Sequence, residues 1–155
     1  MFRFLLLGFI LLMTGCDLLR VYETNHDFND AMWPSADTIT FEIPVPDPTL
    51  HYNVLLNVRN TIDFNTVRLF IQYQLSDSAA TLRKRLIEQN LFDKITGKPF
   101  GDSGLGNIYS HQFLLESGIT FPATGLYQVK LNHMMRYDTL PEIRSIGIRI
   151  EKALE

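Results

Sequence analysis

Short stretches in which apolar and polar residues alternate recur through most of this 155-residue chain. A period of two places successive side chains on opposite faces of a strand, so each stretch predicts a half-buried β-strand. The last run is the cleanest, with Ile146, Ile148 and Ile150 alternating with Gly147, Arg149 and Glu151. Similar runs lie at residues 39–43, 52–58, 67–75, 108–121 and 127–133, and a short first strand is expected near residues 21–24.

Residues 81–92 fit two interpretations. Leu82, Leu86, Ile87 and Leu91 match a helical stripe, but a strand that reaches Ile87 and then turns fits equally well. We favour the strand, because the segments on both sides are themselves predicted strands.

Proline and glycine separate these runs. Pro44, Pro46 and Pro48 exclude an ordinary central strand where they occur, and glycines between residues 97 and 106 predict a loop. Several short strands joined by such turns predict an all-β fold, a single antiparallel β-sandwich of the Ig-like or jelly-roll-like Greek-key kind. Gly125-x-Tyr127 has the spacing of a tyrosine corner, in which the phenol binds backbone a few residues upstream; an ordinary half-buried tyrosine is the alternative.

The N-terminus has the pattern of a lipoprotein signal. Arg3 precedes an apolar run over residues 4–13, and the small residues Thr14 and Gly15 lead to Cys16. The run is too short to cross a bilayer, which needs about 20 residues. A secretory signal without lipidation and a buried core helix are the alternatives.

Cys16 is the only cysteine, and lipidation would consume its thiol as a thioether. We therefore expect residues 1–15 to be a removed signal peptide and Cys16 to carry diacylglycerol and an N-acyl chain, with no other cofactor. Residues 16–36 are then a lipidated tether and first strand, and residues 37–155 form the sandwich without a disulfide.

The composition excludes some classes of partner. The chain is 46% hydrophobic, which is ample for a core, and its formal net charge is −3. It therefore has no electrostatic footprint for nucleic acid. The sequence contains no second apolar run of membrane-spanning length.

Catalytic patterns are weak. Gly101-Asp102-Ser103-Gly104 matches the serine loop of trypsin-like proteases, but no histidine stands in a recognisable upstream motif, so a glycine-rich turn is the better interpretation. The four histidines (His26, His51, His111 and His133) lack the close spacing of a zinc-ligand pair. We expect neither an enzyme nor a metal site.

Three further groups have plain interpretations. Asp93 and Asp102 could hold Ca²⁺, but solvated turn carboxylates fit better. The basic run at residues 83–85 indicates a solvated strand edge. The aromatic residues Trp33, Tyr22, Phe28 and Tyr52 could form a glycan-stacking platform, but core packing is the commoner use.

Several short motifs follow one another in a characteristic order. They are Cys16-Asp17 with Val21-Tyr22-Glu23, Trp33 with Phe41-x-Ile43, Tyr52-Asn53, Asn57-Val58-Arg59-Asn60-Thr61, Gly104-Leu105-Gly106-Asn107-Ile108, Phe121-Pro122-x-x-Gly125-x-Tyr127, Met135-Arg136-x-Asp138-x-Leu140 and Gly147-Ile148-x-Ile150-Glu151-Lys152. This order resembles the gliding-motility lipoproteins called GldH, from Bacteroidetes, over nearly the whole chain. The sequence departs from the family at two places. It has Ile62-Asp63-Phe64-Asn65 where family members often have a Tyr-Pro-Tyr-type segment, and Lys98-Pro99-Phe100 where a Trp is expected before the glycine loop.

The resemblance implies a non-enzymatic, lipid-anchored envelope protein of gliding motility and the linked type IX secretion machinery. It implies other envelope proteins as partners in place of a small-molecule substrate. Asp17 after Cys16 suggests the inner membrane under the enterobacterial sorting rule, but acidic residues after the Cys can accompany outer-membrane placement in Bacteroidetes, so the outer membrane is expected in preference. Arg59, Asn60, Arg136 and Asp138 are the polar positions in its motifs, as interaction residues or as structural ones. A surface glycan-binding module is the alternative function, and it would require a contiguous exposed aromatic patch.

Overall fold

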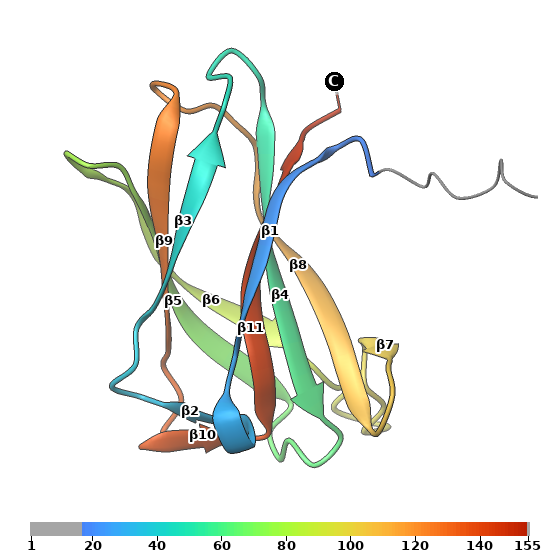
Figure 1. Cartoon of the computed structure of the whole chain (residues 1–155). Coiled ribbons are helices and arrows are strands. Elements are labelled where there is room, and N and C mark those ends of the chain that lie inside the picture. The colour runs from blue at the N-terminus through green and yellow to red at the C-terminus, as the bar shows by residue number, and fades with distance from the viewer. Residues whose placement is uncertain (1–16, 155) are drawn as a thin grey trace, which may run out of the picture.

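Two antiparallel sheets lie face to face in the computed structural model, which describes residues 17–154 (Figure 1). Sheet 1 has the strand order β1 (Arg20–Asp27), β11 (Ile143–Lys152), β4 (Tyr52–Thr61), β8 (Ile108–Ile119) and β7 (Asp102–Ser103). Sheet 2 has the order β3 (Ile39–Val45), β9 (Gly125–His133), β5 (Arg68–Ser76) and β6 (Thr81–Asn90). A 3-10 helix, η1 (Asn29–Ala31), and a small pair of strands, β2 (Met32–Pro34) and β10 (Thr139–Pro141), complete the fold.

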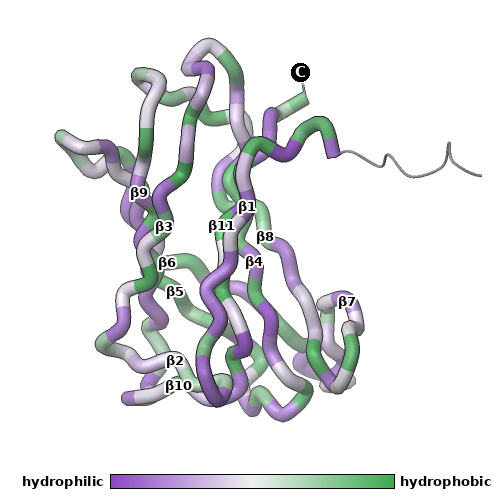
Figure 2. Tube along the Cα trace, in the orientation of Figure 1, coloured by the Kyte–Doolittle hydropathy of each residue, from purple (hydrophilic) through white to green (hydrophobic). Residues whose placement is uncertain are grey.

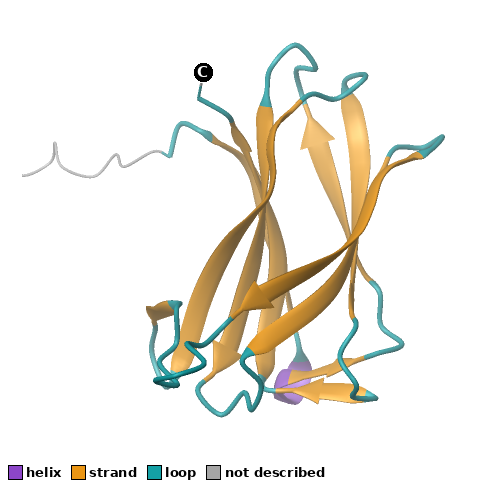
Figure 3. Cartoon of the chain, turned by 180° about the vertical axis from the view of Figure 1, so that it is seen from behind, coloured by secondary structure: helices purple, strands orange, loops and turns teal. Residues whose placement is uncertain are grey.

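The alternation in the sequence is what builds the layers. Apolar residues at alternate positions of the long strands β3, β4, β5, β9 and β11 are buried between the sheets. Figure 2 shows the corresponding alternation of hydropathy along the chain. In β11 the fully buried residues include Ile146, Ile148 and Ile150, while Arg149 and Glu151 lie on the outer face. The view from behind in Figure 3 shows the two sheets as separate layers of strands.

The sandwich has two distinct ends. At one end, called here the anchor end, the backbone of β11 meets the segment that follows Cys16, since Lys152 N donates to Leu19 O (2.8 Å). The loop from β3 to β4 is at the same end, because Ala153 N donates to His51 O (2.9 Å). Strand β1 runs from there to the opposite end, called the far end, where η1, β2 and β10 lie (Figure 1).

Most of the predicted fold is confirmed. The chain is an all-β, sandwich-like domain, and residues 81–90 form a strand, β6. Residues 20–34, expected as tether and first strand, pair with the sandwich through β1 and place Trp33 in its core. The predicted signal peptide and Cys16 lie outside the described residues. Among residues 17–154 no helix is long and apolar enough to cross a membrane.

The tyrosine corner is also present. Tyr127 is buried at the start of β9, and its hydroxyl donates to Ala123 O (2.8 Å) and accepts from Ala123 N (3.2 Å). The phenol therefore binds backbone four residues upstream, as the Gly125-x-Tyr127 spacing predicts.

Candidate functional site

Arg149 is the centre of a group of charges at the anchor end of sheet 1. Its guanidinium nitrogens lie 2.5 Å from Asp17 Oδ2, 3.0 Å from Glu151 Oε2 and 3.5 Å from Glu23 Oε2. Glu23 also lies 3.1 Å from Arg20. Strand pairing brings these groups together, because β1 and β11 place Glu23 opposite Arg149. The cluster ties the residue that follows Cys16 directly to the sandwich.

The charged groups of this cluster stabilise one another in their ionised forms. The hydrogen bond from Arg149 lowers the pKa of Asp17 below its usual value. Burial opposes the charge on Arg149, but hydrogen bonds to Asp17 and Glu151 outweigh it and raise the pKa of the guanidinium. Both groups are therefore fully ionised at neutral pH, and the contact is a charge-assisted one.

A polar ladder continues from this cluster across the outer face of sheet 1. Asn57 Nδ2 donates to Glu23 Oε1 (2.8 Å), and Gln112 Nε2 donates to Asn57 Oδ1 (3.0 Å). An open depression of about 320 Å³ follows the ladder toward Arg59 and Asp102. Its lining offers amide and charged groups that can hydrogen-bond a polar ligand.

Two of the four sequence-predicted polar positions are on β4. Arg59 is exposed at the polar depression and makes no ion pair with any residue of 17–154. Asn60, its neighbour, is fully buried, and its Nδ2 donates to Thr61 O (2.8 Å). Asn60 therefore cannot touch a partner, whereas Arg59 can.

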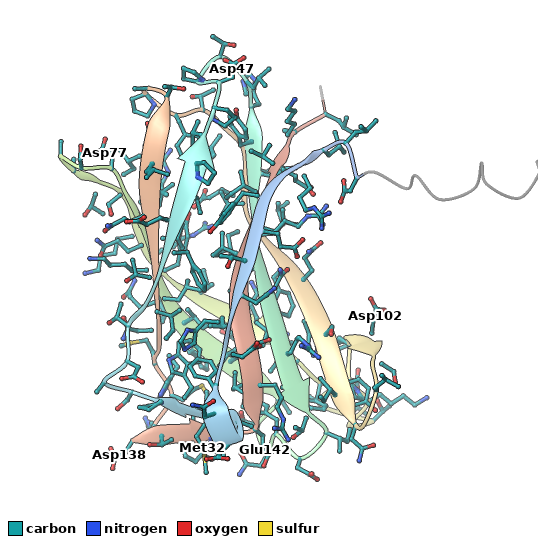
Figure 4. All side chains as sticks on the ribbon, in the orientation of Figure 1. Met32, Asp47, Asp77, Asp102, Asp138 and Glu142 are labelled. Atoms are coloured by element: carbon teal, nitrogen blue, oxygen red, sulfur yellow. The ribbon has the colours of Figure 1, made fainter. Side chains whose placement is uncertain are left out.

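The other two positions lie in the loop between β9 and β10, at the far end. Arg136 and Asp138 are both exposed, and the backbone carbonyl of Asp138 accepts from Ser35 N (2.8 Å). Figure 4 shows Asp138 at the bottom of the molecule, on the opposite side from Asp102. The structure therefore does not bring the four positions into one cluster.

Ser103 does not stand beside a base. It is exposed on the two-residue strand β7, and its side chain makes no hydrogen bond within the described part of the chain. His111, on the paired strand β8, is buried against Gly101, where an added Cβ would lie 2.7 Å from its Nε2. The glycine-rich turn is thus the interpretation that the geometry favours.

The histidines and acidic residues do not gather into a metal-binding group within residues 17–154. His133 is buried on β9, where its ring makes an edge contact with Trp33 at 5.2 Å. No group of three His, Cys, Asp or Glu within residues 17–154 could hold a metal ion. Asp93 caps its own turn, because its Oδ1 accepts from Ile95 N (2.9 Å) and Thr96 N (2.7 Å). Hydrogen bonds from Thr96 and Ile95 lower the pKa of Asp93, as expected for a turn carboxylate.

The basic run is confirmed as a strand edge. Residues 83–85 lie on β6, the edge strand of sheet 2, and are exposed. Arg85 reaches across to sheet 1, where it lies 3.3 Å from Glu116 and donates to Leu115 O.

The aromatic residues pack in the core. Trp33 and Tyr52 are fully buried, Phe28 is stacked on Trp33 at 5.3 Å, and Tyr22 is partly buried against the core. These residues therefore do not form the exposed platform that the glycan-binding alternative requires.

An apolar depression on the outer face of sheet 2 is not predicted by the sequence patterns described above. It has a volume of about 430 Å³ and includes Phe70, Leu86, Met134, Met135 and Tyr137 in its lining. The signal in the sequence is Leu86, which is apolar at an outward position of a strand, and the consecutive Met134-Met135 just after β9.

The family profile and the curated proteins that match this chain carry the same family description. The profile of a family described as GldH lipoprotein matches residues 20–150. A protein named gliding motility lipoprotein GldH homolog, from Christiangramia forsetii, is 25% identical over 97% of this chain and 94% of its own length. The gliding motility lipoprotein GldH of Flavobacterium johnsoniae is 26% identical, over 96% and 94% respectively.

A solved structure, that of dimeric latent PorU from Porphyromonas gingivalis, resembles the chain remotely. It covers 88% of this chain with a TM-score of 0.36 and 10% identity, and the chain spans about 13% of its length. That likeness is too low to bear on function.

Proposed function

The chain belongs to the GldH lipoprotein family, and from this membership we propose that it is a non-enzymatic assembly component of the gliding-motility and linked type IX secretion machinery. Family membership makes it a membrane-anchored envelope lipoprotein of gliding motility. The match over residues 20–150 is the observation that carries the proposal, because it includes almost all of the sandwich.

Anchoring is assigned to Cys16, with diacylglycerol on the thiol and an N-acyl chain such as palmitate on the amine. Two or more acyl chains give stable attachment, since each buried methylene contributes about 0.8 kcal/mol. The cluster around Arg149 supports this arrangement, because it binds Asp17, the residue next to Cys16, to β11. The outer membrane is the proposed location.

Protein–protein contact is the proposed mode of action. The outer faces of the two sheets offer a polar depression near Arg59 and an apolar one near Met134, and neither includes a nucleophile hydrogen-bonded to a base. Partners would be other envelope proteins of the same machinery.

Labelling with radioactive palmitate and membrane fractionation test the anchor. The wild-type chain should be labelled and should sediment with outer membranes, whereas a Cys16→Ser chain should lose the label and leave the membrane fraction. A label that persists in the Cys16→Ser chain would contradict the assignment.

A deletion strain tests the machinery. Loss of the gene should reduce surface spreading and the amount of protein secreted into the medium, and the wild-type gene should restore both. Normal spreading together with normal secretion in the deletion strain would overturn the proposed function.

A further inference from the structure

The apolar depression on the outer face of sheet 2 has the properties of a docking surface. We propose that it binds an extended segment of a partner envelope protein, in which an apolar side chain is flanked by carboxylates. This inference rests on the proposed function, because it names the surface through which the protein–protein contact is made.

The floor of the depression is built by strand pairing. Phe70 on β5 and Met134 after β9 are neighbours, since Met134 N donates to Phe70 O (2.8 Å). Met135 Sδ accepts from Phe70 N (3.4 Å), which fixes the start of the loop. Leu86 contributes from β6, beside Gln72 of β5.

Two of these apolar side chains are unusually accessible for their type. Leu86 is 57% exposed and Met134 is 55% exposed, in a chain that buries most of its large apolar residues. Contiguous exposed apolar surface of this kind marks interaction sites, and flexible methionine side chains adapt to different partners.

Positive charge lies beside the depression, since the carboxylate on its border, Glu88 opposite Phe70, is paired with Arg68 (2.7 Å). Lys84 is on β6, two residues before Leu86, and faces the same side of sheet 2. Lys130 is on β9, two residues before Asn132, and lies on that outer face too. Arg136 is part of the lining of the apolar depression. None of the three makes an ion pair within residues 17–154. A chain with net charge −3 therefore presents three cations without an ion pair beside its apolar depression, which complements carboxylates in a partner.

An extended partner also fits the edge of the sheet. β6 is the outermost strand of sheet 2 and pairs only with β5 in the described structure. Its free edge can accept main-chain hydrogen bonds from an added strand, while Leu86 beside it receives the apolar side chain. A second copy of this chain is disfavoured, because edge-to-edge pairing of two β6 strands would bring their basic residues together.

The position of the depression argues against a lipid surface. Strand β1 leads from Arg20, near Asp17, for eight residues, about 26 Å, to the far end. Met134 is at that end, because His133, the residue before it, contacts Trp33 of β2. The headgroup potential decays over a Debye length of about 8 Å at physiological salt. A membrane that holds the anchor end is therefore beyond the reach of the cations at the depression.

Site-specific photocrosslinking of the full-length protein in its own cells tests the inference. A photoreactive phenylalanine analogue is placed at Leu86 or at Met134, and at Leu114 as the matched control. Leu114 is 54% exposed and lies on the outer face of sheet 1, so it samples the same compartment with equal accessibility. Crosslinked peptides are identified by mass spectrometry.

The expected result is an adduct from Leu86 and Met134, absent from Leu114, that joins each position to one segment of another envelope protein. That segment should contain an apolar residue with Asp or Glu on both sides. Adducts to lipid, to a second copy of this chain, or to the same proteins as Leu114 would each overturn the inference, and so would the absence of any adduct.

Variants separate this inference from the proposed function. The double variant Leu86→Asp and Met134→Asp should reduce the adduct formed from a photoreactive group at Tyr137 at least tenfold, whereas Leu114→Asp should leave it unchanged. Unchanged crosslinking in the double variant would contradict the docking surface even where the deletion strain shows its motility or secretion defect. Circular dichroism melting of the purified variants confirms that they are folded.

Discussion

Tyr127 fixes the loop before β9 to the strand with two hydrogen bonds to Ala123. Tyr127→Phe keeps the buried ring but leaves the N–H and carbonyl of Ala123 without this partner. We expect the free energy of unfolding to fall by about 1–2 kcal/mol. Urea denaturation of the domain measures it.

Tyr109→Phe is the matched control for that variant. Tyr109 is half-buried on β8, and its hydroxyl has no hydrogen bond in the described structure, so its removal should change stability by less than about 0.5 kcal/mol. Equal losses in the two variants would show that the corner is not the source of the effect.

His133 makes the core sensitive to acid. Burial lowers the pKa of its imidazole below the usual value and outweighs the opposite effect of the Trp33 backbone. Both ring nitrogens are buried, and neither has a hydrogen-bond partner of good geometry within residues 17–154. Because the folded-state pKa lies below that of the unfolded chain, protonation favours unfolding. The contribution of neutral His133 is therefore complete above about pH 6.5, the pKa of the unfolded chain, and is lost as the pH falls from there through the lower pKa of the folded chain.

Denaturation at pH 7.5 and pH 5.5 tests this dependence. The wild-type chain should lose stability between the two values, and His133→Leu should lose less. His111 is buried too, and burial lowers its pKa, so His111→Phe should have the same direction of effect. If the stability of both His133→Leu and His111→Phe falls with pH as steeply as that of the wild type, buried histidines are not the source of the acid sensitivity.

Gly147 sets the spacing between β1 and β11. A Cβ at this position would overlap with Asn25 Oδ1 and would lie 2.5 Å from the backbone oxygen of Thr24. The side chain of Asn25 can move, but the Thr24 carbonyl belongs to the strand, so β1 would have to shift. This close approach is a physical reason for the glycine in the family motif at residues 147–152.

Gly147→Ala should therefore weaken the outermost strand of sheet 1. We expect a loss of about 1–3 kcal/mol and faster hydrogen exchange of amides in β1 than in β4. Gly104→Ala is the control, because the nearest atom to its Cβ is at 3.3 Å. If β1 and β4 exchange at unchanged rates in Gly147→Ala, the proposed strand shift is wrong.

The long strands were predictable because each shows its period over enough residues. β3, β4, β5, β9 and β11 all bury alternate residues where the sequence alternates. β2, β7 and β10 were not predictable, because strands of two or three residues carry no period. Trp33 was expected in the core on general grounds, but nothing local shows that β2 pairs with β10.

The candidate sites were harder to predict, because they depend on pairing between distant strands. Arg149 meets Asp17 and Glu23 only because β11 lies beside β1, and the chain between them is more than a hundred residues long. The apolar depression likewise joins β5, β6 and the loop after β9. Arg59 and Arg136 were recognised as motif positions. Only the fold shows that Arg59 lines the polar depression of sheet 1 and Arg136 the apolar depression of sheet 2.

The anchor end and the far end of the sandwich define its orientation relative to a lipid anchor. Asp17 is bound to Arg149 at the anchor end, and Lys152 and His51 are at the same end through backbone hydrogen bonds. Asp138 is at the far end, away from the loop of Asp47 (Figure 4). A lipid on Cys16 would therefore hold the loop of His51 near the bilayer and the apolar depression away from it.

Energy transfer from a labelled residue to acceptor lipids measures this direction. With Cys16 consumed by lipidation, His51→Cys or Asp138→Cys introduces a single reactive thiol into the lipoprotein reconstituted in vesicles. Both side chains are exposed and make no side-chain hydrogen bond within residues 17–154. Transfer falls steeply with distance, so a donor at residue 51 should transfer much more efficiently than one at residue 138.

The Arg149 cluster is what would maintain this difference. Arg149→Met removes the contacts with Asp17, Glu23 and Glu151 while keeping most of the side-chain volume, so the segment before β1 becomes free to pivot. Transfer from the two positions should then become more alike, whereas Arg59→Met, which removes an unpaired guanidinium from the same face, should preserve the difference. Equal transfer from residues 51 and 138 in the unaltered protein would show that the domain tumbles on its anchor, and the far-end depression would then be free to approach lipid.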